Sequence, residues 1–152
     1  MKTRNLLPAE ASRPRKVRPS SRRVVAVAVA RRRKRGVEWL LVESRGGALT
    51  LPKGGVHQGE GKIKAARRET VEEAGWKVRR RDVKFSFRYR HLSRRGRLQN
   101  VDAFVAVGGE RVRRPRQERW RDRRWLSADE ALRHPQVPRE LAKALQRASG
   151  NL

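Results

Sequence analysis

Hydrophobic runs separated by basic or glycine-containing turns predict several short strands in this chain. The segment "RVVAVAVA" (23–30) is apolar almost throughout, and "EWLLVES" (38–44) follows it after the turn "RRRKRGV". Apolar runs of this length, bounded by turn residues, are typical of buried strands. A third run, "RLQNVDAFVAV" (97–107), follows the turn "SRRG" and is expected to form a hairpin with the segment that precedes that turn.

That preceding segment, "VKFSFRYR" (83–90), alternates strictly between apolar and polar residues. Successive side chains of a strand point to opposite faces of a sheet. Val83, Phe85, Phe87 and Tyr89 are therefore expected on one face of a half-buried strand, with the basic and polar residues on the other face.

Helical patterns occur in three places. The first helix is expected over about 61–74, and the last in "PRELAKALQRA" (138–148), whose proline suits a first helical turn. Between them, the strand "RRWLS" (123–127) ends at Ser127, which with Glu130 forms a capping-box pattern and begins a short helix. Strands, a helix, strands and helices in this order predict an α/β fold, with a mixed sheet covered by helices on its faces.

The first helix has a narrow apolar stripe. At 100° per residue, Ile63, Ala66, Thr70 and Ala74 fall on one side of the helix. We expect this stripe to pack on the sheet.

Charge and composition narrow the possible partners and compartment. The 152 residues suit one domain, and 41 basic against 15 acidic residues give a net charge of +26. Such a surface attracts polyanions, which leaves phosphate-rich small molecules, nucleic acid and acidic membranes open. No apolar run approaches the roughly 18 residues of a membrane-spanning helix, so no membrane span is expected. The absence of cysteine excludes disulfides and suits a cytoplasmic protein.

The first 21 residues differ from the rest of the chain. They mix proline, serine and basic residues without periodicity, which predicts a flexible basic N-terminal arm. The folded domain is accordingly expected over residues 22–152.

The acidic residues gather at the first helix. Glu60, Glu69, Glu72 and Glu73 all lie between residues 60 and 73. Like charges at i, i+4, such as Glu69 and Glu73, destabilise a helix by a few tenths of a kcal/mol, so a cation is expected beside them. Hard divalent ions prefer carboxylate oxygens. A solvated acidic face is the alternative on spacing alone, but the glycine-rich loop "LPKGGVHQGEG" leading into the helix favours a ligand site.

The loop and helix together carry a family pattern. Gly54, Glu60, "RE" at 68–69, "EE" at 72–73 and Gly75 reproduce the spacing of the Nudix box, Gx5Ex7REUxEExGU, where U is apolar. Thr70 stands at the first U position and still suits the stripe. The chain thus resembles the Nudix hydrolases, and the resemblance implies an α/β/α sandwich. It also implies hydrolysis of a phosphoanhydride bond with Mg²⁺ or Mn²⁺.

The resemblance assigns roles within the box. Glu69 and Glu73 are implied as metal ligands, helped by a backbone carbonyl near Lys53. Glu72 is implied as a ligand or as the general base that activates water.

Arg68 and Glu60 are implied as a catalytic pair that orients the carboxylates. Many family members use a further acid downstream, for which Glu118 is the candidate. An ion pair between Glu118 and a neighbouring arginine is the alternative.

The resemblance extends to substrate binding, where it points to the diphosphoinositol polyphosphate and diadenosine polyphosphate hydrolases. Basic residues at places where such enzymes bind phosphate, together with the glycine-rich loop, give a candidate substrate-binding set. Its members are Arg22, Arg23, Arg45, Lys53, Gly54, Gly55, Arg94, Arg95 and Arg97. The segment "LPKGG" is closer to diadenosine tetraphosphate and RNA 5′-pyrophosphate hydrolases, so an RNA 5′-pyrophosphohydrolase is an alternative.

A non-catalytic nucleic-acid-binding module is a further alternative, suggested by the net charge and the basic arm. The aromatic residues fall mostly in expected strands, so no surface for stacking bases is expected. The complete set of carboxylates favours an enzyme.

Overall fold

The computed structural model describes residues 23–152, so the predicted arm and Arg22 lie outside the described residues. The elements of this part are β1 (Val24–Arg33), β2 (Gly36–Glu43), β3 (Leu49–Thr50), β4 (Lys53–Gly55), α2 (Lys62–Ala74), β5 (Trp76–Lys77), η2 (Arg80–Asp82), β6 (Val83–Leu92), β7 (Leu98–Val107), β8 (Glu110–Arg111), η3 (Arg116–Glu118), β9 (Arg123–Ser127), α3 (Ala128–Arg133) and α4 (Arg139–Ser149). The expected strands and helices are all present, with ends shifted by a few residues.

The main sheet is mixed, as predicted. Its strands run in the order β3-β2-β1-β7-β6, with β4 paired to β1 and β9 paired to β2. Strands β1 and β7 are parallel, from Val24 opposite Val101 to Ala30 opposite Val107. The β6–β7 hairpin and the other pairs of this sheet are antiparallel. Strands β5 and β8 form a separate small sheet.

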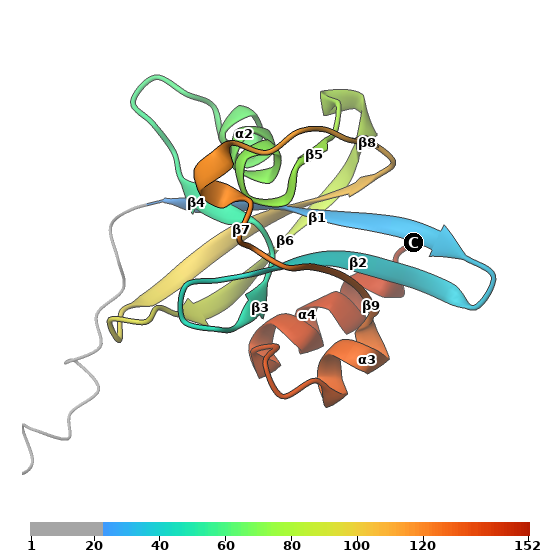
Figure 1. Ribbon diagram of the computed structural model, residues 1–152. Coiled ribbons are helices and arrows are strands. Elements are labelled where there is room, and N and C mark those ends of the chain that lie inside the picture. The colour runs from blue at the N-terminus through green and yellow to red at the C-terminus, as the bar shows by residue number, and fades with distance from the viewer. Residues whose placement is uncertain (1–22) are drawn as a thin grey trace, which may run out of the picture.

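Helices cover both faces of the main sheet, which confirms the α/β/α sandwich (Figure 1). The alternation of β1 divides the core. Val25, Val27 and Val29 belong to the apolar cluster that includes Ala65 and Ala66 of α2. The alternating alanines of β1 belong to the cluster that includes the buried residues of α3 and α4. The apolar run of β1 is therefore buried on two sides, as expected for a central strand.

The α2 stripe is only partly as predicted. Ala66, Thr70 and Ala74 are buried, and Ala65 is buried beside them, but Ile63 is only half-buried in the first turn. Thr70 keeps its hydroxyl satisfied by donating to the carbonyl oxygen of Ala66 at 2.7 Å. A threonine at this apolar position therefore leaves no unsatisfied donor in the core.

The prediction for 83–90 was wrong at one residue. Phe85, Phe87 and Tyr89 pack in the cluster on the α4 side, whereas Val83 packs in the cluster on the α2 side. The pairing register of β6 with β7 shifts between Val83 and Phe85. A bulge inserts an extra residue and so breaks strict alternation.

Across residues 23–152, none of the helices combines the length and the apolar character needed to cross a lipid bilayer.

The helix α4 anchors one core cluster, and we predict that truncating it destabilises the fold. Leu145 is fully buried, so Leu145→Ala should lower the free energy of unfolding by about 2–5 kcal/mol through lost burial and the remaining cavity. Urea denaturation followed by circular dichroism measures this. The matched control is Leu92→Ala at a side chain that is 60% exposed, with an expected change below about 1 kcal/mol. Equal losses in the two variants would contradict this view of the core.

Candidate active site

Glycine is required at two positions around α2. Strand β4 comes so close to the helix that a Cβ atom at Gly54 would overlap the carboxylate of Glu69. Gly75 ends the helix with a φ of 62°, a left-handed conformation that favours glycine. A Cβ atom there would lie 2.8 Å from the carbonyl oxygen of Val112. These glycines therefore fix where the helix ends and how near β4 approaches its carboxylates.

Arg68 holds three of the carboxylates. Its Nε donates to Glu60 Oε2 at 2.9 Å and its Nη2 to Glu60 Oε1 at 3.0 Å, a two-pronged pair. Its Nη1 donates to Glu69 Oε2 at 3.0 Å and reaches Glu72 Oε1 at 3.5 Å. The hydrogen bonds from Arg68, together with one from the backbone of His57, lower the pKa of Glu60 to about 2. Arg68 therefore joins the loop before α2 to the helix itself.

Glu73 faces β4 and the segment before β9. Its Oε1 accepts the backbone N–H of Lys53 at 3.1 Å, and its Oε2 lies 3.8 Å from Nη2 of Arg121. Burial raises the pKa of Glu73 to about 7; the charge of Glu69 adds to this effect, and Arg121 and Lys53 oppose it. A divalent cation beside Glu73 would favour the ionised carboxylate.

The expected metal ligands offer the right donors for a hard divalent ion. Glu69, Glu72 and Glu73 supply carboxylate oxygens from neighbouring turns of one helix, the donor type that Mg²⁺ prefers. Within residues 23–152, however, no group of three or more acidic or histidine side chains converges on one point. Glu72 is the most exposed of the three, at 42%, and its contact with Arg68 is long at 3.5 Å. Lys53 touches this group through its backbone N–H.

A basic hollow of about 830 Å³ adjoins the carboxylates. The predicted residues that line it are Arg45, Lys53, Arg94, Arg95 and Arg97, from the end of β2, from β4 and from the β6–β7 hairpin. Among the described residues, none of its lining side chains is a carboxylate. His91 also lines it, and burial and the charge of Lys53 lower the pKa of this imidazole to about 4. Lys53 connects the hollow to Glu73 through its backbone N–H.

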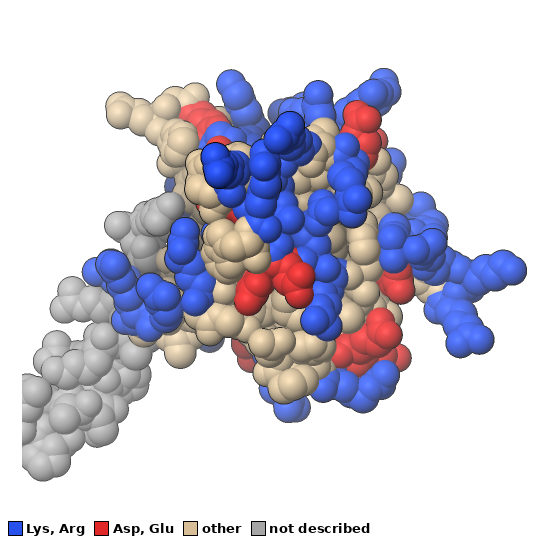
Figure 2. Space-filling view, viewed as in Figure 1, with Lys and Arg blue, Asp and Glu red and all other residues tan. Residues whose placement is uncertain are grey.

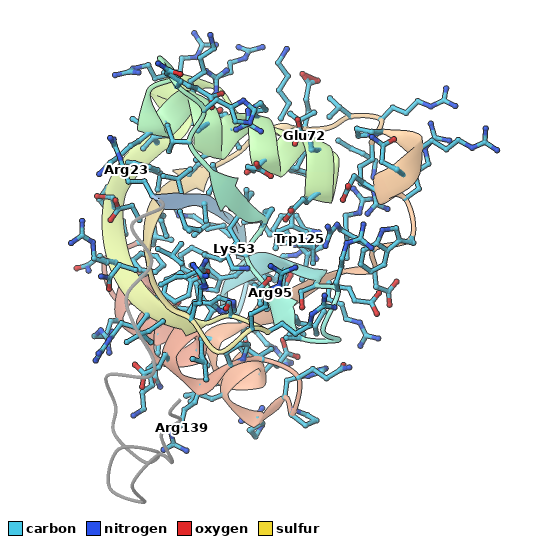
Figure 3. All side chains as sticks on the ribbon, turned by 90° about the vertical axis from the view of Figure 1, so that its left-hand side faces the viewer. Arg23, Lys53, Glu72, Arg95, Trp125 and Arg139 are labelled. Atoms are coloured by element: carbon cyan, nitrogen blue, oxygen red, sulfur yellow. The ribbon has the colours of Figure 1, made fainter. Side chains whose placement is uncertain are left out.

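Other predicted binding residues lie elsewhere. Arg23 is exposed at the start of the described chain and does not line the basic hollow, and Figure 3 places it apart from Lys53. Gly54 and Gly55 lie against α2, where the Gly55 carbonyl accepts Nη2 of Arg68 at 3.0 Å. Arg22 lies outside the described residues.

Glu118 forms an ion pair with a neighbouring arginine, which was the alternative to a catalytic role for this residue. Its Oε1 accepts Nε of Arg121 at 2.6 Å. Arg121 is 9% exposed, and its Nη1 also donates to the carbonyl oxygen of Glu43 at 2.8 Å. The sequence did not single out Arg121, because nothing local distinguishes it from the arginines around it. The structure nonetheless makes it the residue that links Glu118 to Glu73.

Three of the four tryptophans lie together, which nothing in the sequence indicated. Trp76, Trp120 and Trp125 line a second hollow of about 340 Å³ together with arginines from β8 to β9. Trp39 is fully buried in the core, and Trp76 and Trp125 are partly buried against the cluster on the α2 side.

Positive charge covers much of the molecular surface. On the face in Figure 2, lysine and arginine side chains gather where the segment between β8 and β9 crosses α2, and acidic side chains form small isolated groups. This surface will attract polyanions.

Comparisons with known proteins agree with this fold and box. A family model described as the NUDIX domain matches residues 20–147. No curated protein matches the chain. A C. elegans Ap4A hydrolase structure is similar with a TM-score of 0.64 and 18% identity, covering 86% of this chain and 96% of that one. The Nudix hydrolase RenU from M. smegmatis gives 0.63 and 16%, covering 86% and 88%. A MutT Nudix hydrolase from Burkholderia pseudomallei gives 0.62 and 22%, covering 84% and 96%.

At these identities the solved structures establish the fold, and the domain match establishes the family. The chain belongs to the Nudix family of hydrolases, which cleave phosphoanhydrides and generally depend on divalent metal ions.

Proposed function

We propose that this protein uses Mg²⁺ or Mn²⁺ to cleave a phosphoanhydride bond in a highly phosphorylated small molecule, such as a diphosphoinositol polyphosphate or a dinucleoside polyphosphate. The observation that supports this most is the basic hollow, which is lined by five cationic residues and meets the carboxylates of α2 at Lys53. A substrate with several phosphate groups would neutralise those cations. The Ap4A hydrolase among the similar structures is consistent with a dinucleoside polyphosphate.

In this proposal each residue of the box has a separate task. Glu69 and Glu73 would hold the divalent ion, and Glu72 would be a further ligand or take the proton from the attacking water. Arg68, fixed by Glu60, orients these carboxylates. The ion, when bound, neutralises charge on the phosphates and lowers the pKa of water.

The basic hollow binds the rest of the substrate. Lys53 lies between the carboxylates and the basic hollow. It lines the hollow, and its backbone N–H contacts Glu73. Phosphate oxygens of the substrate pair with the guanidinium groups of Arg45, Arg94, Arg95 and Arg97. The planar donors of these groups are suited to phosphate. His91 stays neutral at pH 7 and serves as a hydrogen-bonding group, because its pKa lies near 4.

An RNA 5′ end is the second candidate substrate. The turn between β1 and β2 carries a basic group of Arg32, Arg33, Lys34 and Arg35, which lines another open hollow. Figure 1 shows this turn at the opposite end of the sheet from the β6–β7 hairpin. A long polyanion bound at the basic hollow could contact this second group, and its binding would then weaken steeply with salt.

We predict that Glu72→Gln abolishes most activity without unfolding the protein. Loss of a general base typically costs about 10²–10⁴-fold in turnover. Glu72 is 42% exposed, so its replacement should leave the unfolding transition unchanged. Steady-state kinetics with circular dichroism measures both. Glu140→Gln, at an exposed site on α4, is the control. A Glu72→Gln protein with wild-type turnover would exclude the proposed role.

Metal removal should abolish hydrolysis. EDTA is expected to reduce the rate of hydrolysis to background, and Mg²⁺ or Mn²⁺ in excess should restore it. The reason is that the metal ion held by the carboxylates neutralises the charge on the phosphates. A hydrolysis screen with inositol pyrophosphates, dinucleoside polyphosphates, nucleoside triphosphates, ADP-ribose and triphosphorylated RNA would measure this and identify the substrate. Turnover that persists in EDTA would rule out the mechanism.

Charge in the basic hollow should set substrate preference. Arg95→Gln is expected to raise KM by roughly three- to tenfold for a substrate with many phosphates, through one lost charged hydrogen bond. The effect on ADP-ribose should be smaller. Arg139→Gln is the control, since Arg139 is exposed on α4 and distant from Lys53 in Figure 3. Equal KM changes for both substrates would remove Arg95 from the binding set.

A further inference from the structure

The second hollow combines aromatic and cationic side chains in a way the phosphate chemistry above does not use. We call it the tryptophan–arginine hollow, and its polar and aromatic lining is Trp76, Arg111, Arg114, Arg119, Trp120, Arg121, Asp122, Arg123 and Trp125. Its volume of about 340 Å³ falls at the lower end of the range for ligand pockets. Asp122 is the single acid among these described residues.

The arginines here are held in place by the end of α2. Nη1 of Arg123 donates to the carbonyl oxygen of Ala74 at 2.8 Å. Nη1 of Arg114 lies 3.3 Å from the carbonyl oxygen of Glu73. Arg114 also donates to the carbonyl oxygen of Arg121 at 2.7 Å. Arg114 Nη1 also lies 3.4 Å from the carbonyl oxygen of Glu118. These bonds all come from Nη1, and each guanidinium group has five N–H donors. Burial lowers the pKa of both Arg114 and Arg123, and the neighbouring arginines add to that effect.

Crowded, half-buried cations of this kind are stabilised by an anion. Arg121 is already paired with Glu118 and Glu73. For the other four guanidinium groups, Asp122 is the one carboxylate among the lining residues, and like charges at short range repel more strongly where water is excluded. The remaining guanidinium donors match phosphate oxygens in geometry. The charge in the hollow therefore selects a phosphate group.

The aromatic side selects a flat ring. Trp120 is 43% exposed, an unusual state for so large an apolar side chain. The guanidinium carbon of the buried Arg121 lies 4.6 Å from the centre of its ring, and that of the exposed Arg45 lies 5.2 Å away. A nucleobase could replace the exposed Arg45 on the ring, because bases and guanidinium groups use the same aromatic face. Trp76 and Trp125 meet edge to face, 5.4 Å apart, and form another wall.

The hollow lies next to the box, where Arg121 joins it to Glu73. Arg121 lines it and reaches Glu73 Oε2 at 3.8 Å, whereas Lys53 lines the basic hollow and binds Glu73 Oε1. Trp120 lines the tryptophan–arginine hollow and Arg45 lines the basic hollow. The contact between these two side chains also connects the hollows. A bond cleaved near Glu73 would thus lie next to two cationic sites, one of which is also aromatic.

From this arrangement we propose that the tryptophan–arginine hollow binds a nucleoside monophosphate group, with the base on Trp120 and the phosphate on the arginines. This proposal rests on the proposed function, because the nucleoside monophosphate group is taken as one end of the cleaved substrate. The phosphates at the other end of that substrate occupy the basic hollow. It favours substrates with a nucleotide end over inositol derivatives.

The test is direct binding to the full-length protein in EDTA, where hydrolysis plays no part. AMP is titrated against ribose 5-phosphate, which has the same sugar and phosphate without a base. Indole N–H signals in two-dimensional NMR locate the ligand. We expect AMP to shift the signals of Trp76, Trp120 and Trp125 and not that of Trp39, whose N–H is held by Ser149 in the core.

Three variants separate stacking from charge. AMP should bind at least about fivefold more tightly than ribose 5-phosphate, since stacking on an aromatic side chain contributes this much or more. Trp120→Ala should remove that preference. Arg111→Gln, within the hollow, should weaken both ligands, and Arg35→Gln should change neither, although it removes the same charge. A 5′-phosphorylated hexaadenylate distinguishes an RNA end from a free nucleotide end as the natural ligand. Binding as tight as that of AMP supports an RNA end, and weaker binding supports a free nucleotide end.

Either of two results would overturn the proposal. One is equal affinity of the wild-type protein for AMP and ribose 5-phosphate. The other is a preference for AMP that survives in Trp120→Ala. Hydrolysis of a dinucleoside polyphosphate and of an inositol pyrophosphate is measured in parallel with Mg²⁺. Failure of the wild-type protein to hydrolyse either one would count against the proposed function without affecting the nucleotide site.

Discussion

The arrangement of this site depends on how two arginines hold crowded carboxylates in place. Glu60, Glu69, Glu72 and Glu73 would repel one another along one helix and its leading loop if left alone. Arg68 binds the first three, and Arg121 lies beside the fourth. The close approach of β4, possible because residue 54 is glycine, adds a backbone N–H from Lys53. The acidic site is therefore preformed within a protein whose net charge is +26.

The same balance explains why both hollows can be so basic. Cations in each hollow are connected to one carboxylate, Glu73, through Lys53 on one side and Arg121 on the other. Binding of an anion in either hollow would relieve repulsion among the arginines there, and a metal ion would take over the neutralisation of Glu73. The site is thus suited to a ligand that brings negative charge to the hollows and to a cation that meets the carboxylates.

Local patterns predicted most of the fold and the acidic half of the site. Alternation in β6 and the apolar run of β1 identified their buried faces, and only Val83 was misplaced because a bulge leaves no mark in the hydrophobic pattern. The Nudix box lies within one helix and the loop before it, so the family resemblance was sufficient to predict that Arg68 meets Glu60. Arg121 and the gathering of Trp76 with Trp125 depend on contacts between distant segments, which no local periodicity encodes. In so basic a chain, an arginine with a special role also looks like any other.

The central claim is that the carboxylates of α2 capture a divalent ion and present it to a phosphoanhydride. Anomalous diffraction from crystals soaked with Mn²⁺ and a non-hydrolysable substrate analogue tests it most directly. The account predicts an anomalous peak within coordination distance of Glu69 and Glu73, with Glu72 turned toward it and away from Arg68. An analogue bound in the basic hollow while Glu69, Glu72 and Glu73 keep their ion pairs, with no metal peak beside them, would contradict it.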